Sequence, residues 1–182
     1  MARESLRLTL LASIAALAAT RQLTVATAQL AERDSFANGI ARICSFIGEA
    51  SQAGAQVVVF PEAALTGYGA ERVARVAPDD LAAAEDAVCA ACRRHSIAAI
   101  VGTARDGYNS ALVVDADGSA LCRQHKMMLV PTDLPWARPG DTLHVFTLCG
   151  APCSVMVERG DGRDGVGAAM RGRERERGGV CG

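Results

Sequence analysis

The sequence predicts a layered α/β domain, and three observations support this fold class. Short apolar runs typical of buried strands alternate with two segments whose apolar residues recur at helical spacing. Half of the 182 residues are hydrophobic and 21% are charged, which is typical of a globular chain. The first three elements have the order strand, helix, strand, which favours a parallel pair of strands with a helix across it.

The expected strands are short and bounded by turn residues. The first strand is Leu-Thr-Val-Ala-Thr-Ala-Gln-Leu, and a later pair forms a hairpin around Asp115-Ala-Asp-Gly118. In chain order, the expected strands cover residues 23–30, 56–60, 97–103, 110–114, 120–123, 143–148 and 154–157.

Two helices are expected between these strands. The first carries isoleucines at positions 40, 43 and 47 on one face and ends at Gly54. Asp34 is expected to cap it, or Asn38 if the helix starts later. The second helix runs from about Pro78 to His95, because the acids that follow Pro78 suit a helix N-terminus.

A carboxylate follows the strand at 56–60. Val57 to Phe60 form a continuous apolar run, which is typical of a strand buried on both faces. Pro61 ends that strand because proline cannot donate to a sheet ladder, and Glu62 comes next. Partial desolvation disfavours the charged form of such a carboxyl and makes Glu62 a candidate general base. The alternative is an exposed acid that merely ends a strand.

Lys126 is the only lysine among 19 Lys and Arg residues. Lysine offers a compact ammonium whose pKa can be tuned, which guanidinium does not. Lys126 leaves the second hairpin strand and leads into a loop that contains Trp136 and Pro139-Gly140-Asp141. The alternative is a solvated side chain at a strand end.

These two segments resemble the nitrilase (carbon–nitrogen hydrolase) superfamily. Val-Val-Val-Phe-Pro-Glu-Ala-Ala-Leu-Thr-Gly-Tyr, at 57–68, is similar to the family's first catalytic segment, and the order strand, Lys126, loop, Pro-Gly-Asp is similar to the second. The resemblance implies an incomplete αββα sandwich, the N-terminal part of the family's domain. It implies Glu62 as general base and Lys126 as stabiliser of the oxyanion, within a Glu-Lys-Cys triad. Many members of the family carry a second Glu in the loop after the Lys, and the nearest carboxylate here is Asp133.

The family's nucleophilic Cys has no counterpart at its expected position. That position falls on Val157 or Glu158, and neither residue can form a thiolate. Cys153 lies four or five residues earlier, about 13–16 Å away along a strand, and Cys149 is more distant. Both are therefore expected to be packing residues. We interpret the break as a truncation or a shift of reading frame before the nucleophile.

The resemblance implies hydrolysis of a non-peptide amide, nitrile or carbamoyl compound, with no cofactor and no metal. Because the Cys is missing, we expect this chain as written to be inactive. The alternative is a non-catalytic homologue that binds a ligand or a partner. The expected partner is a small-molecule amide or nitrile, and the family also implies a homo-oligomer. A net charge of −1 and 4% aromatic residues give no reason to expect nucleic acid or a membrane as partner.

The chain divides into three expected segments. Residues 1–22 form a leader, 23–157 a partial carbon–nitrogen hydrolase domain, and 158–182 a Gly/Arg-rich disordered tail. The leader has the outline of a signal peptide, but a leading helix or an upstream start codon explains it too. We therefore expect a cytoplasmic protein, or a secreted one if residues 1–22 are a signal peptide.

Cys89, Cys92 and His95 form the remaining constellation. Two thiols and an imidazole at this spacing suit zinc ligands or a redox pair. However, the sequence contains no second ligand pair, and the motif lies near the end of its helix. Packing in the core is the favoured interpretation.

Overall fold

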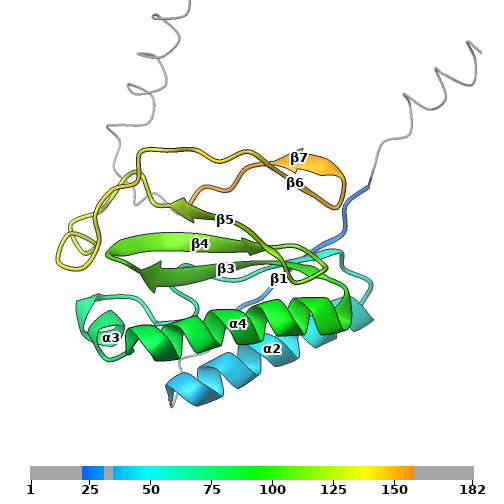
Figure 1. The fold of residues 1–182 in the computed structure, drawn as a ribbon, viewed down its shortest axis with the longest axis horizontal. Coiled ribbons are helices and arrows are strands. Elements are labelled where there is room, and N and C mark those ends of the chain that lie inside the picture. Colours follow the sequence, from blue (N-terminus) through cyan, green and yellow to red (C-terminus); the bar gives the residue numbers. More distant parts are fainter. Residues whose placement is uncertain (1–21, 31–34, 158–182) are drawn as a thin grey trace, which may run out of the picture.

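A five-stranded sheet forms the centre of the computed structural model, which describes residues 22–30 and 35–157 (Figure 1). Its strands occur in the order β1-β2-β3-β4-β5, with β1 to β3 parallel and β3 to β5 antiparallel. Their bounds are β1 Val25–Thr27, β2 Val57–Val59, β3 Ala98–Arg105, β4 Tyr108–Val114 and β5 Ala120–His125. The expected tail and all but the last residue of the expected leader lie outside the described residues, so both remain predictions.

Two long helices, α2 (Phe36–Gln52) and α4 (Pro78–His95), cover one face of the sheet (Figure 1). Both match the expected helices. The isoleucine stripe of α2 packs inward, and Ile43 and Ile47 have no exposed surface. The expected cap at Asn38 is wrong: Ser35 caps α2 by accepting a hydrogen bond from the backbone N–H of Asn38. The other expected cap, Asp34, lies outside the described residues.

β3 and β4 form a hairpin, and both strands reach further toward its turn than the expected strands 97–103 and 110–114 do. β3 and β4 meet across a two-residue turn, Asp106-Gly107, whose φ angles are +55° and +75°. Positive φ at both positions suits an Asp-Gly hairpin turn, and it continues the pairing to Arg105 and Tyr108. As a consequence Asn109 belongs to a strand, although the sequence suggested that this strand begins at residue 110.

The chain's last expected strand, 154–157, is wrong. Instead β6 (Phe146–Leu148) and β7 (Ala151–Cys153) pair as a hairpin, around a turn in which Cys149 and Gly150 have φ of +52° and +75°. The turn reverses the chain earlier than the apolar pattern suggested. A short helix, α3 (Ala70–Ala74), was not expected from the sequence.

The face of the sheet opposite the helices carries a second apolar cluster. Val57, Ala98 and Val113 of the sheet pack there with Leu148 of β6, and all four are almost fully buried. The layers are therefore helices, five-stranded sheet and a small second sheet, which is an incomplete αββα sandwich (Figure 1). No helix in the described part of the chain is long and apolar enough to cross a membrane.

Gly102 of β3 lets the segment after β2 cross the sheet. A Cβ at this position would lie 2.3 Å from the Pro61 carbonyl oxygen and 2.4 Å from the Ala63 nitrogen. Ala63 itself has a φ of +50°, in the left-handed region that non-glycine residues rarely adopt. The backbone N–H of Leu65 then donates to the Gly102 carbonyl at 2.9 Å. Glu62 is thus held by backbone packing on β3.

Replacing Gly102 by alanine should displace the Glu62 segment. The new methyl group would meet backbone atoms that cannot rotate away, so we expect a loss of about 3 kcal/mol or more in unfolding free energy. Urea denaturation measures it. Gly54→Ala is the matched control, because Gly54 has a φ of +82° but a Cβ added there would have no atom within 4 Å. It should cost only about 1–2 kcal/mol. Equal losses for the two variants would contradict the role given to Gly102.

Candidate active site

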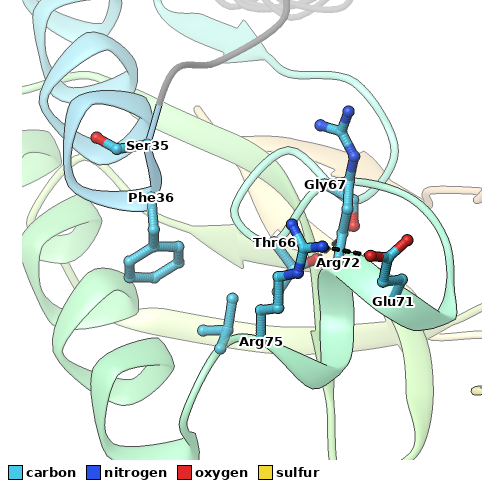
Figure 2. A pocket seen from close by; sticks show the side chains of 8 residues that line it. Ser35, Phe36, Thr66, Gly67, Glu71, Arg72 and Arg75 are labelled. Atoms are coloured by element: carbon cyan, nitrogen blue, oxygen red, sulfur yellow. Dashed lines mark hydrogen bonds and ion pairs between the residues drawn. The ribbon is translucent and has the colours of Figure 1, made fainter.

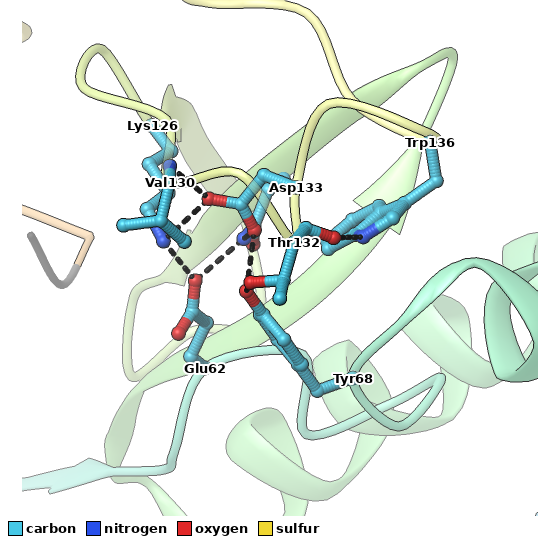
Figure 3. Close-up of polar contacts among 8 residues, drawn as sticks. Glu62, Tyr68, Lys126, Val130, Thr132, Asp133 and Trp136 are labelled. Atoms are coloured by element: carbon cyan, nitrogen blue, oxygen red, sulfur yellow. Dashed lines mark hydrogen bonds and ion pairs between the residues drawn. The ribbon is translucent and has the colours of Figure 1, made fainter. Parts of the chain in front are cut away.

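Glu62 and Lys126 meet at one edge of the sheet. β2 and β5 both end at this edge, and each residue follows shortly after its strand. The Lys126 ammonium donates a hydrogen bond to Glu62 Oε1 at 2.8 Å (Figure 3). The backbone N–H of Lys126 also bonds to the Asn109 carbonyl at 2.7 Å, which continues the β4–β5 pairing. The two residues singled out from the sequence are therefore in direct contact.

Asp133 is the second carboxylate of the cluster. Its Oδ2 lies 2.8 Å from the Lys126 ammonium, so one cation is shared by two carboxylates (Figure 3). The side chain of Lys126 is 2% exposed and that of Asp133 is fully buried, whereas Glu62 keeps 17% of its surface. Glu62 is therefore the most exposed member of the cluster.

The loop from Lys126 to Gly140 positions Asp133. Its ends are joined by a hydrogen bond from the Gly140 N–H to the Lys126 carbonyl at 2.9 Å. Gly140 is needed there, because a Cβ would lie 2.6 Å from the Cβ of His125. Within the loop, the Val130 N–H donates to Asp133 Oδ2 at 3.0 Å. The Pro-Gly pair noted in the sequence thus closes the loop that presents the second carboxylate.

The charges in the cluster stabilise one another. Burial alone would lower the pKa of Lys126, but hydrogen bonds and charge from Asp133 and Glu62 outweigh it and raise that pKa above 10.5. Burial alone would raise the pKa of Asp133. Hydrogen bonds from Lys126, Val130 and Tyr68 outweigh it and lower that pKa below 3.8. Lys126 is therefore an ammonium and Asp133 a carboxylate at neutral pH.

Two residues that the sequence did not single out complete the polar network. Asn109 Nδ2 donates to Glu62 Oε1 at 2.5 Å and approaches Asp133 Oδ1 at 3.4 Å. The Tyr68 hydroxyl donates to Asp133 Oδ1 at 2.8 Å and lies 2.7 Å from the Thr132 hydroxyl. The available signal for Asn109 was its type, since asparagine is depleted in strands and here precedes an apolar run.

Tyr68 and Trp136 join the two loops that flank the cluster. Their rings meet edge to face with centroids 5.6 Å apart, and the Trp136 indole N–H donates to the Thr132 carbonyl at 2.9 Å (Figure 3). Tyr68 follows Glu62 in the chain, and Trp136 follows Asp133. This aromatic contact therefore fixes the segment that carries Glu62 against the loop after Lys126.

The position expected for the nucleophile lies at the limit of the described chain. Val157 is the last described residue, and Glu158 lies outside. After β7 the chain runs back toward the end of β5, from which Lys126 comes (Figure 1). Cys149 and Cys153 instead pack against the apolar cluster under the second sheet. No described cysteine makes a hydrogen bond to Glu62, Lys126 or Asp133.

Cys89, Cys92 and His95 lie at the helix layer. Cys92 is fully buried, and burial raises the pKa of its thiol to about 12. The ring of His95 packs against Gly48 of α2. The described residues contain no group of three or more His, Cys, Asp or Glu side chains that could hold a metal ion. The motif therefore packs the two helices together.

A surface hollow of about 360 Å³ lies beside α3 (Figure 2). It is lined by Ser35 and Phe36 at the start of α2, by the turn at Thr66 and Gly67, and by residues of the α3 segment. Glu71 and Arg75 form an exposed ion pair on its rim. Neither Glu62 nor Lys126 lines it, so this hollow is separate from the charged cluster.

The shared ammonium predicts how stability depends on pH. A carboxyl whose pKa is lowered by folding stabilises the folded protein fully at pH values above its ordinary pKa, which is 3.8 for Asp133. This stabilisation is lost as the pH falls through the lowered pKa. Lys126 stabilises the folded protein fully at pH values below 10.5, its ordinary pKa, and this stabilisation is lost as the pH rises through its raised pKa. Urea midpoints measured from pH 7 to pH 2 should therefore fall less steeply below pH 4 in Asp133→Asn than in the parent. Parallel curves would contradict the ionic role of Asp133.

The family profile described as "Carbon-nitrogen hydrolase" matches residues 24–169. No curated protein matches the chain significantly.

Among solved structures, an amidase from Nesterenkonia sp. is similar, with a TM-score of 0.68 and 22% identity over 74% of this chain and 54% of that one. A variant of the Nesterenkonia sp. AN1 amidase, carrying acrylamide added to its active-site cysteine, has a TM-score of 0.69 and 21% identity over 74% of this chain and 57% of that one. Another variant, in complex with butyramide, has a TM-score of 0.68 and 22% identity over 74% of this chain and 55% of that one. The chain thus spans little more than half the length of these amidases, and the likeness shows the fold. On the match to its family profile, the chain belongs to the carbon-nitrogen hydrolase family.

Proposed function

We propose that Glu62 and Lys126 are the general base and the oxyanion-stabilising group of a site for small amides, nitriles or carbamoyl compounds. One observation carries this proposal: a buried ammonium 2.8 Å from a carboxylate that remains partly exposed. A buried cation that stays charged can stabilise a negative charge developing on a substrate oxygen or nitrogen. A partly exposed carboxylate beside it can accept a proton.

The hydrogen-bonding capacity of Lys126 supports its role. An ammonium has three N–H donors. Two of them are directed at Glu62 and Asp133, and the described residues provide no partner for the third. The third N–H is therefore available to a substrate oxygen that becomes negatively charged. Asp133 and Glu62 hold the ammonium in place while it makes that contact.

The hydrogen bonds of Glu62 support its role as base. Within the described chain, Lys126 and Asn109 donate hydrogen bonds to Glu62, and both bonds end on Oε1. Figure 3 shows the other oxygen directed away from Asp133. Oε2 is thus available to take a proton from a thiol, return it to the departing nitrogen, and later take one from water.

The reaction itself requires a thiolate. Its sulfur forms a bond to the substrate carbon, the carbon–nitrogen bond breaks as the nitrogen leaves with the proton from Glu62, and water then cleaves the thioester. We propose that this chain as written does not complete that sequence, because neither Val157 nor Glu158 supplies a thiol. In a variant of the Nesterenkonia sp. AN1 amidase in which glutamine replaces a glutamate, acrylamide is found added at the active-site cysteine.

A second proposal is a homologue that binds without turnover. A variant of the Nesterenkonia sp. AN1 amidase, in which alanine replaces a cysteine, is found in complex with butyramide. This complex supports a homologue that holds an amide although a cysteine has been removed. Glu62 and Lys126 would then be ligand-binding groups. The homo-oligomer and the cytoplasmic location expected from the sequence remain predictions.

Introducing a cysteine tests whether Glu62 acts as a base. We expect Val157→Cys or Glu158→Cys in the full chain to give a thiol that reacts with acrylamide faster than any native cysteine, measured by peptide mass spectrometry. In that background, Glu62→Gln should slow the modification by about 10²-fold or more, because proton transfer by a positioned base contributes about 10²–10⁴-fold. Release of ammonia from butyramide would report full turnover.

Met156→Cys is the matched control. Met156 is 65% exposed and adjacent to Val157, so its thiol is accessible without being placed at the predicted nucleophile position. It should react at the rate of an ordinary exposed thiol, whether or not Glu62 is present. If both Val157→Cys and Glu158→Cys behave like Met156→Cys, the role of Glu62 as base is contradicted. Butyramide binding that depends on Lys126 would then favour the second proposal.

A further inference from the structure

We propose that Asn109 is a positioning residue, which fixes Oε1 of Glu62 so that Oε2 remains free for proton transfer. This inference rests on the proposed role of Glu62 as base. It starts from the geometry of one fully buried side chain on β4. Asn109 Nδ2 lies 2.5 Å from Glu62 Oε1, on the same oxygen that Lys126 contacts.

The orientation of the Asn109 amide follows from its neighbours. Its NH₂ group lies between Glu62 Oε1 and Asp133 Oδ1, at 2.5 Å and 3.4 Å. Both neighbours are carboxylate oxygens and can only accept when ionised. The reversed amide would place its own oxygen against them, which is electrostatically unfavourable. The NH₂ group therefore faces the two carboxylates, and Oδ1 faces away.

This orientation leaves Oδ1 without a partner. It is the buried side-chain polar atom in the described part of the chain that makes no hydrogen bond. An unpaired buried acceptor is destabilising, and such groups are rare. Gln124, another buried amide on a neighbouring strand, shows the usual arrangement: its amide bonds to the His125 and Thr142 carbonyls and accepts from the His144 N–H. Asn109 thus retains an unfavourable atom at a position where it also holds Glu62.

A neutral donor suits this position better than a charged one. The charged groups around Asn109 are Lys126 at the end of β5, Asp133 in the following loop and Glu62 itself, with the Tyr68 hydroxyl on Asp133. Two carboxylates already share one ammonium there. An acid in place of Asn109 would add a third negative charge, whereas a second cation would compete with Lys126 for Glu62. An amide adds a hydrogen bond and no net charge.

The single lysine of the chain provides a direct readout. In protein labelled with [ε-¹³C]lysine, the only side-chain lysine signal comes from Lys126. Its shift should show an inflection at acid pH as the carboxyl groups beside it take up protons. Asn109→Leu removes a hydrogen bond to the carboxylate cluster around Lys126, so the inflection should move to higher pH. Asn109→Asp should move it up as well, through like-charge repulsion, and Asn109→Ser should move it least.

Gln124→Met is the matched control, because it removes a buried amide that contacts neither carboxylate. It should lower the urea midpoint and leave the inflection unchanged. If Asn109→Leu and Asn109→Asp also leave the inflection unchanged, the positioning role is overturned. Where Asn109→Leu does not fold, the isosteric Asn109→Asp and the smaller Asn109→Ser decide the question.

These titrations use the full chain without substrate, so their result is separate from that of the proposed function. Suppose that the inflection moves in Asn109→Leu but Glu62→Gln does not slow the reaction of the introduced thiol. Asn109 would then position Glu62, but Glu62 would not act as the base. If the inflection does not move but Glu62→Gln slows the reaction of the introduced thiol, only the positioning role of Asn109 is rejected. In the Val157→Cys background, Asn109→Ser should retain more acrylamide reactivity than Asn109→Leu.

Discussion

The contact on which the site depends is the ammonium of Lys126 between the carboxylates of Glu62 and Asp133. Both are 2.8 Å away, and the cation is almost fully buried. Removing one member of a buried ion pair typically costs about 3–5 kcal/mol, because an uncompensated charge remains. The cluster therefore fixes three segments of the chain: the one after β2, the one at the end of β5, and the loop after Lys126. Its charge state is also what gives the edge of the sheet its proposed chemistry.

A second buried carboxylate shows that burial alone does not make a functional group. Glu85 of α4 is 3% exposed and lies on the helix side of the sheet. Thr103 donates to its Oε1, and Arg105 and Arg123 both donate to its Oε2. Both oxygens are occupied, so Glu85 ties α4 to β3 and β5. Glu62 differs because both of its hydrogen bonds within the described residues end on one oxygen.

Backbone packing explains why charged groups can be held so closely. Gly102 accepts the Pro61–Ala63 backbone directly on β3, and Gly140 brings the loop end against His125. The φ of +50° at Ala63, immediately after Glu62, is the kind of strain that surrounding structure must maintain. Tyr68 and Trp136 supply that support from the side chains of the two loops.

The sequence by itself determined the α/β class, both long helices, and the two segments that carry Glu62 and Lys126. Apolar periodicity, Pro61 and the single lysine are local signals that need no knowledge of distant contacts. The tertiary structure decided what those signals cannot encode. The Asp106-Gly107 turn extended β4 to include Asn109, the loop closure at Gly140 brought Asp133 to the ammonium, and the Cys149-Gly150 turn ended the last strand at Cys153. In each case a turn or a close backbone approach sets the register of the chain, and that register exists only once the sheet has formed.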